Sequence, residues 1–314
     1  GFSIEGALQP FSGLTGSPIA PFRDATHCRA SFALTLRDCL GGLKRARGQG
    51  WFDLDTFDLD AYHDMDAPEG GDMHRICPKL VAFRGPDDRQ LENSSALPPQ
   101  AYAGRLKALG VTAVVRLNEA ETYDGRAFEA AGFRHCDLFF TDCTTPSETL
   151  VRTFLRECDA AQGAVAVHCL AGLGRTGTMI GAWLMRSAGF TAREAIGWMR
   201  IVRPGSVIGP QQHFLAAIEG RLRGEAIACR DDDDDDMDND KEEGASVVQT
   251  REEETEHDAS QPYTCSQPWT ETSPTMVAAT MAADVEAAMR DRARAKRREG
   301  GDVSWRWEAG SAAA

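Results

Sequence analysis

Residues 164–177 place the strongest constraint on how this chain can fold. Ala164 to Val167 is a short, wholly apolar segment, and a glycine-rich stretch and then an apolar helical pattern over 174–188 follow it directly. A segment of this kind is typical of a strand buried on both faces of a parallel sheet. The sequence therefore predicts a central parallel strand that passes through a tight turn into a helix.

The rest of the chain from residue 79 onward has the same alternating character. Segments rich in strand-forming residues at 80–83, 111–117 and 133–140 alternate with helical patterns at 98–109, 125–131 and 147–161, the last capped by Ser147. Two more helices are predicted at 191–201 and 210–222. This alternation predicts an α/β fold with a mostly parallel central sheet flanked by helices.

The first 78 residues are less regular. Residues 1–27 are rich in Gly, Pro and Ser and predict irregular structure, whereas apolar positions spaced by three and four over 31–47 predict an amphipathic helix capped by Ser31. Residues 51–75 contain eight acidic residues and a Gly-Gly pair, which predict a loop without a long helix.

Negative charge is concentrated in one segment. The net charge is −14, and residues 230–258, with 15 acidic and 3 basic residues, account for −12 of it. Residues 1–229, with a net charge of −2, have no basic stripe for nucleic acid. No run in the chain reaches the ~18 apolar residues of a membrane span. The charge run predicts a disordered tail. The tail's basic end, residues 290–298, is either a solvated partial helix or a patch for nuclear import or an acidic partner.

The nine cysteines do not form a recognisable framework. Their number is odd, and no Cys-x-x-Cys pair is present. A disulfide scaffold or a zinc site is therefore not predicted, and reduced thiols are expected. We expect neither a metal nor an organic cofactor.

The glycine-rich stretch has the composition of a phosphate-binding loop. Five residues separate Cys169 from Arg175, so the chain can curl with the thiol at the floor of a cradle and the guanidinium at its rim. Converging backbone N–H groups and the following helix favour an anion and a thiolate there, and a thiolate under a bound phosphate can attack phosphorus in line. A cysteine and an arginine at this spacing also occur by chance, but the full string is far more specific. The predicted loop comprises His168, Cys169, Leu170, Ala171, Gly172, Leu173, Gly174 and Arg175.

The string HCLAGLGRTG resembles the His-Cys-x5-Arg-Ser/Thr signature of the protein tyrosine and dual-specificity phosphatases. Four further strings, MRIVRPGSVIGPQQHFL, RLN, AGFRHCDLFFTD and PFRDA, are similar to the cell-division-cycle-fourteen phosphatases, and the resemblance spans residues 10–222. Members of that family are proline-directed phosphoserine phosphatases of mitotic exit. They carry two tandem phosphatase-like domains, of which only the second is catalytic.

This resemblance implies a division of the chain. Residues 1–50 would be the remnant of the non-catalytic domain, which implies N-terminal truncation, and residues 51–78 an acidic linker that contributes to a substrate groove. Residues 79–224 would be the catalytic domain, and 225–314 a disordered tail that is acidic and then basic.

The resemblance also implies a role for each residue of the site. Asp142 occupies the general-acid position, where it would protonate the leaving serine oxygen and then activate water. Thr176 would donate a hydrogen bond to the Cys169 sulfur, and His168 would orient the loop. Gln211 and Gln212 would place the hydrolytic water.

Substrate selection follows from the same comparison. The family selects phosphoserine followed by proline, with a basic residue three places beyond, and the acids that would attract that base are Asp66, Asp72 and Asp64. Without the family resemblance, the sequence predicts only that these acids lie in a solvated loop. Two departures from the family accompany them: Leu170 replaces a lysine, which disfavours inositol phosphates, and Cys143 replaces a glycine. Cys143 is either incidental or a partner for a reversible disulfide with Cys169.

The sequence thus predicts a dual-specificity cysteine phosphatase for phosphoserine, phosphothreonine and phosphotyrosine, acting in cell-cycle or mitotic-exit control. The expected partners are phosphoprotein substrates of proline-directed kinases, in nucleus and cytoplasm, without nucleic acid or membrane; a homodimer is compatible with the family. The alternatives are a phosphoinositide phosphatase on the same scaffold, a catalytically impaired phosphopeptide-binding module and an inactive fragment.

Overall fold

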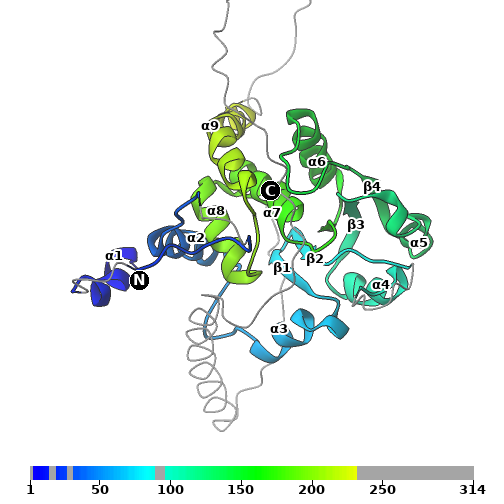
Figure 1. Cartoon of the computed structure of the whole chain (residues 1–314), viewed down its shortest axis with the longest axis horizontal. Coiled ribbons are helices and arrows are strands. Elements are labelled where there is room, and N and C mark those ends of the chain that lie inside the picture. The colour runs from blue at the N-terminus through cyan, green and yellow to red at the C-terminus, as the bar shows by residue number, and fades with distance from the viewer. Residues whose placement is uncertain (1–2, 14–18, 27–30, 89–95, 232–314) are drawn as a thin grey trace, which may run out of the picture.

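The computed structural model describes residues 3–13, 19–26, 31–88 and 96–231 (Figure 1). Residues 225–231, the start of the predicted disordered tail, are helical in this structure, so this part of the prediction is wrong. The rest of that tail from residue 232 onward, with its basic end and the predicted import patch, lies outside the described residues.

A five-stranded sheet forms the centre of the molecule. The strands are β1 (Met73–Cys77), β2 (Leu80–Phe83), β3 (Val111–Arg116), β4 (Arg134–Asp137) and β5 (Ala164–His168), and their spatial order is β1-β2-β5-β3-β4. All pairs are parallel except the β1–β2 hairpin at one edge. Every residue of β5 is buried. The prediction of an α/β fold with a mostly parallel sheet is confirmed.

Helices cover both faces of this sheet because its strands alternate between two apolar cores. From β2, Leu80 and Ala82 enter the larger core, and Val81 and Phe83 enter the smaller one, as the two-residue period of a strand requires. The larger core includes α6 (Glu148–Ala160), α7 (Gly174–Ala188), α8 (Ala192–Val202) and part of α9 (Pro210–Asp231). The smaller core includes α4 (Pro99–Ala108) and α5 (Arg126–Ala130).

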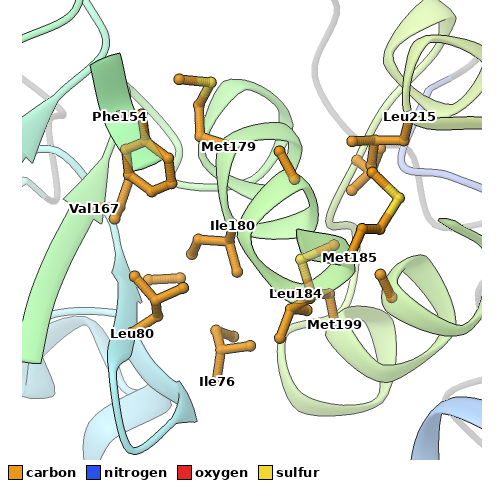
Figure 2. Close-up of a cluster of buried hydrophobic side chains, with 14 of the residues drawn as sticks. Ile76, Leu80, Phe154, Val167, Met179, Ile180, Leu184, Met185, Met199 and Leu215 are labelled. Atoms are coloured by element: carbon orange, nitrogen blue, oxygen red, sulfur yellow. The ribbon is translucent and has the colours of Figure 1, made fainter. Parts of the chain in front are cut away.

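Figure 2 shows how the larger core anchors the helix that follows the central strand. Met179 and Ile180 of α7 face Val167 of β5 and Leu80 of β2, and Phe154 of α6 lies beside Val167 and Met179. All five of these side chains are fully or almost fully buried. The start of α7 is therefore held rigidly against the end of β5.

Helix ends follow from local hydrogen bonds. Ser147 accepts from the Leu150 N–H at the start of α6, as predicted. Thr191 and Glu194 form a reciprocal capping box at α8. The N-terminal amphipathic helix α2 (Leu36–Gly48) is capped by a Thr35–Asp38 box, not by Ser31 as predicted.

Three regions differ from the sequence prediction. Residues 1–27 contain α1 (Ile4–Leu8), capped by Ser3, and the short 3-10 helix η1 (Gln9–Phe11). The predicted acidic loop contains α3 (Leu59–Asp66), η2 (Pro68–Gly70) and β1, because Asp58 caps α3 and β1 pairs with β2. A further 3-10 helix, η3 (Ala120–Thr122), follows β3, and α9 continues past residue 222 to Asp231.

Helix α2 packs directly on α8, and the two lie side by side in Figure 1. The α2 residues Cys39 and Ala46 join the same core as α7 and α8. The proposed boundary at residue 50 stays a prediction, although this helix shares its core with the phosphate-loop helix. Among the described residues, no helix is long and apolar enough to cross a membrane.

Candidate active site

The predicted phosphate loop lies where β5 ends and α7 begins. Cys169 is the first residue after β5 and is only 2% exposed. Gly172 has a φ of +70°, and a Cβ atom there would lie 2.1 Å from the Phe83 carbonyl oxygen. The loop therefore rests directly on the end of β2, at a spacing that only glycine permits.

Hydrogen bonds turn the loop carbonyls outward. The Leu170 carbonyl accepts from Gly85 N–H at 3.0 Å. The buried Arg203 donates from Nη2 to the Ala171 carbonyl at 2.9 Å and from Nε to the Gly172 carbonyl at 2.8 Å. In a planar trans peptide the next N–H points opposite to the carbonyl. The N–H groups of 171, 172 and 173 therefore turn away from these partners, and they bond no other described residue.

Arg175 is buried at the mouth of this loop and is 1% exposed. Its Nη1 donates to the Phe140 carbonyl at 3.1 Å and the Leu117 carbonyl at 3.4 Å, so the ends of two neighbouring strands position it. Its Nε makes no hydrogen bond within the described chain but lies 3.2 Å from Asp142 Oδ1. The structure thus brings the predicted arginine and general acid together.

Asp142 occupies a turn that presents its carboxylate to the loop. Its side chain is 52% exposed, and its Oδ1 accepts from the Cys143 N–H at 3.0 Å. Cys143 has a φ of +58°, which produces the sharp turn after the acid. Whether Cys143 pairs with Cys169 under oxidation remains a prediction. Glu119, which the sequence did not single out, lies 3.6 Å from Arg175 Nη1 on the other side.

Thr176 and Leu170 have contrasting surroundings. Thr176 is buried, and its Oγ1 bonds no group within the described chain, which leaves its proton for the predicted bond to sulfur. Leu170, by contrast, is 51% exposed. An exposed apolar side chain therefore stands at the loop position where the family has a lysine.

His168 holds the loop from below through a hydrogen-bonded chain. Burial lowers the pKa of His168 to about 3, so the ring is neutral at physiological pH. Its Nδ1 lies 3.1 Å from the Cys169 carbonyl, which can only accept, so Nδ1 carries the proton. Its Nε2 then accepts from the Tyr123 hydroxyl at 2.7 Å, and that oxygen lies 2.9 Å from His135 Nε2. These contacts are compatible with the predicted role of His168 in orienting the loop, which stays a prediction.

Both predicted water-positioning residues are buried at the start of α9. Gln211 donates to the Thr144 carbonyl at 3.0 Å, and its Oε1 accepts from the Ile208 N–H. Gln212 donates to Asp24 Oδ2 and to the Gly209 carbonyl, and its Oε1 accepts from Arg200. Placement of water by these glutamines remains a prediction, and both side chains also hold protein groups in this structure.

The three predicted groove acids have different surroundings. Asp72 accepts from Arg203 Nη1 at 2.7 Å, so it braces the arginine that holds the loop. Asp66 lies 3.2 Å from Nε2 of the buried His74, and this contact lowers the pKa of Asp66. Asp64 is exposed. Of these three acids, Asp64 and Asp66 are exposed to solvent and Asp72 is half-buried.

Asp66, Asp72 and His74 lie close enough together to suggest a metal site. However, Arg203 Nη1 is 2.7 Å from Asp72 Oδ1 and 2.9 Å from His74 Nδ1. This buried positive charge opposes a cation at the same position. The cluster is therefore better explained as a charge network that supports the loop.

The loop after the central parallel strand combines a buried cysteine, carbonyls that turn outward and a buried arginine. This combination defines the protein tyrosine phosphatase class. Residues 93–189 match a family model described as a polymorphic toxin system DSP-PTPase phosphatase. Three curated relatives are also similar. Human dual specificity protein phosphatase CDC14A is 49% identical over 214 residues, which are 67% of this chain and 36% of that protein.

Mouse CDC14B is 46% identical over 205 residues, covering 64% of this chain and 42% of the relative. The tyrosine-protein phosphatase CDC14 of Saccharomyces cerevisiae is 39% identical over 218 residues, covering 66% and 39%. The chain belongs to the CDC14 dual specificity phosphatases. It spans less than half the length of each of these relatives.

Sequence reasoning missed Arg203, Arg200 and Asp24. The first two stand in the string Met199 to Leu215 and the third in the string PFRDA, so the family resemblance contained them. Their roles depend on contacts between residues as much as 188 positions apart. No local pattern predicts such contacts.

Proposed function

We propose that this chain is a cysteine-dependent protein phosphatase that acts through a cysteinyl-phosphate intermediate. The observation that carries the proposal is the loop around Cys169, where three N–H groups and the Arg175 Nε lack acceptors among the described residues. Donors arranged in this way stabilise the charge that develops on a transferring phosphoryl group.

The first step transfers the phosphoryl group to sulfur. The Cys169 thiolate attacks phosphorus, the bond between phosphorus and the substrate oxygen breaks, and Asp142 donates its proton to the leaving oxygen. The guanidinium of Arg175 binds two phosphoryl oxygens in its planar fork. Proton donation matters most for serine and threonine because their alkoxides are strongly basic.

The second step regenerates the enzyme. The Asp142 carboxylate accepts a proton from water, the water oxygen attacks phosphorus, and the phosphorus–sulfur bond breaks. Inorganic phosphate and the Cys169 thiolate result, and Thr176 Oγ1 donates a hydrogen bond to the departing sulfur. Gln211 and Gln212 would orient the water in this step.

The substrates we infer are phosphoproteins of proline-directed kinases, with phosphoserine or phosphothreonine before proline and a basic residue beyond. Phosphotyrosine is the second substrate class, as expected for a dual specificity enzyme. The exposed carboxylates of Asp64 and Asp66 favour a basic residue, whereas Asp72 is committed to Arg203. The names of the relatives support a role in the cell cycle. Action in mitotic exit, in nucleus and cytoplasm, is part of the proposal, and a homodimer is compatible with it.

The same site fits a phosphoinositide phosphatase less well. A loop that binds several phosphate groups gains from additional positive charge, but Leu170 presents an exposed apolar side chain there. A phosphopeptide-binding module would not require Asp142 beside Arg175.

The experiment is hydrolysis in EDTA of two phosphopeptides, one with phosphoserine-Pro-x-Lys and one with Ala for Pro and Glu for Lys. The proposal predicts turnover of the first peptide, loss in Cys169→Ser and a fall of about 100-fold or more in Asp142→Asn. Equal turnover of both peptides would remove the substrate preference and keep the chemistry. Binding of the first peptide by a folded chain without turnover would indicate a binding module.

A further inference from the structure

Asp24, in the segment before α2, contacts the turn at the start of α9. Asp24 accepts four hydrogen bonds on its carboxylate. The Thr26 N–H and Oγ1 donate to Oδ1 at 3.3 and 2.7 Å, and the Gly209 N–H and Gln212 Nε2 donate to Oδ2 at 2.7 and 2.9 Å. One oxygen thus fixes the carboxylate within its own segment, and the other binds the start of α9.

Residues 208–212 form a tight turn that contains both buried glutamines. Gly209 has a φ of +52° and directly precedes Pro210, the first residue of α9. Proline has no N–H to donate, so the Gly209 N–H and the glutamine side chains are the groups through which this turn is held. Asp24 binds two of them with a single oxygen.

Arg200 holds the same turn from the opposite side. Its Nη2 donates to Gln212 Oε1 at 2.6 Å and to the Val207 carbonyl at 2.8 Å, and its Nη1 donates to the Phe22 carbonyl at 2.7 Å. The amide of Gln212 therefore lies between a carboxylate and a guanidinium. Since both of its N–H bonds have acceptors, its side chain is fixed.

The turn at 208–212 is also linked to the loop that carries the general acid. Gln211 Nε2 donates to the Thr144 carbonyl at 3.0 Å, two residues after Asp142. Elsewhere in that loop, the Phe140 carbonyl accepts from Arg175, and Asp142 lies 3.2 Å from Arg175 Nε. Asp24 thus binds one side of the turn and Gln211 links the same turn to the acid loop, with the backbone of residues 208–212 joining the two sets of hydrogen bonds.

We propose that Asp24 is a positioning residue that holds the turn at 208–212 and, through Gln211, keeps Asp142 over the phosphate loop. The inference rests on the proposed function, because it concerns how Asp142 is placed to protonate the leaving group. It extends the working catalytic unit to the segment before α2. Among the described residues, the carbonyls of the phosphate loop are held mainly by Arg203 and Gly85, neither of which bonds Asp24. One contact, from the Val207 N–H to the Leu173 carbonyl at 3.3 Å, joins the loop to the residue before the turn.

Because Asp24 acts on the loop that carries Asp142, its substitution should slow the cleavage of some substrates and not of others. Cleavage of a phosphoserine peptide needs a proton from Asp142, whereas an aryl phosphate with a leaving group stable as an anion needs little protonation. Disturbance of the acid loop alone therefore slows phosphorus–oxygen cleavage for the peptide and not for the aryl ester. General loss of structure would slow both and would also weaken oxyanion binding in the loop.

The experiment uses the full chain with Asp24→Asn, which removes the charge and one of the acceptor oxygens at nearly constant shape. Thr26→Val is the matched control, since it removes one donor to Oδ1 and leaves the two contacts to the turn. Active sites are titrated with tungstate, and single-turnover rate constants are measured for the phosphoserine peptide and for the burst with an aryl phosphate.

The proposal predicts that Asp24→Asn lowers the peptide rate constant by about tenfold, a fraction of what general acid catalysis contributes. The aryl-phosphate burst and the tungstate affinity stay within about twofold, and Thr26→Val resembles the parent. In a Gln211→Ala background, Asp24→Asn should have little further effect, because the two act through one path.

Unchanged peptide cleavage in Asp24→Asn, or parallel loss for both substrates after normalisation to titrated sites, would overturn the positioning role. Full additivity with Gln211→Ala would also contradict it. An inactive parent chain would instead overturn the proposed function, so the two failures are distinguishable.

Discussion

A few buried charged side chains hold the backbone and side chains of this site in place. Arg203 is 2% exposed and binds two loop carbonyls, the Asp72 carboxylate and His74. A buried guanidinium requires partners of this kind for its donors. The signature string predicted Cys169 and Arg175, and the family resemblance predicted Asp142. Arg175 and Asp142 meet at 3.2 Å, and Cys169 is buried at the start of the loop that leads to Arg175. Arg203 could not be assigned from its string because its partners are more than 30 residues away.

The buried side chain of His168 predicts that the free energy of unfolding depends on pH. Burial lowers its folded-state pKa to about 3 from an ordinary value of 6.5, so the unfolded chain binds the extra proton between these values. The free energy of unfolding should therefore fall as the pH drops from 6.5 toward 3, by up to about 1.4 kcal/mol per pH unit from this group. The measurement is urea unfolding across this range, for the parent and for His168→Asn.

Asn is chosen because its amide N–H can replace the donor at Nδ1. The pH slope of the variant should be shallower than that of the parent. Identical slopes would mean that His168 does not stay neutral in the folded chain. His74 and His135 also have pKa values lowered by burial, so they keep part of the slope in both proteins.

At the scale of elements, the phosphate loop depends on the contact between the end of β2 and the start of α7. The apolar content of β5 and α7 predicted both elements closely, because burial on all sides leaves a strong pattern. In contrast, β1 was missed because it contains His74 and Arg75 and reads as polar. The partners of these side chains come from the folded chain: Arg203 lies 2.9 Å from His74, and Arg75 donates to the Pro78 and Leu109 carbonyls.

Gly172→Ala should destabilise the chain and abolish turnover, since a Cβ atom would lie 2.1 Å from the Phe83 carbonyl oxygen. Strain at positive φ costs about 1–2 kcal/mol, and displacement of the loop adds to this. Gly132→Ala is the control, because Gly132 has a φ of +89° with nothing within 4 Å of a Cβ atom. The free energies of unfolding and the tungstate affinities of both variants test the difference.

The control should lose stability by the strain alone and keep its tungstate affinity. An equal loss of stability in both variants, with tungstate bound normally by Gly172→Ala, would contradict the close contact of loop and strand.

At the scale of the whole molecule, the N-terminal helix is part of the phosphatase core. Helix α2 touches α8 so closely that a Cβ atom on Gly42 would lie 2.3 Å from the Glu194 carbonyl oxygen. Arg45 also pairs with Glu194 at 3.0 Å. The amphipathic pattern predicted the helix, but periodicity does not say which surface a helix covers. The pairing of α2 with α8 therefore could not be predicted from the sequence.

Gly42→Ala tests this packing. The clash with backbone should cost about 1–3 kcal/mol of unfolding free energy, more than the ~1 kcal/mol that alanine gains in a helix. Gly48→Ala, in the same helix with nothing within 4 Å, should be neutral or stabilising. Thermal and urea unfolding of both variants provide the measurement. Stabilisation by both substitutions would show that α2 does not pack on α8 in solution.

The central claim is that Cys169 forms a covalent bond to phosphorus, and a trapped intermediate tests it most directly. The chain is mixed with a phosphoserine-Pro-x-Lys peptide carrying labelled phosphate, quenched in denaturant within a single turnover, and mapped by mass spectrometry. The account predicts label on Cys169 alone and none in Cys169→Ser. Turnover of the peptide without label on the protein, or with label on another residue, would contradict it.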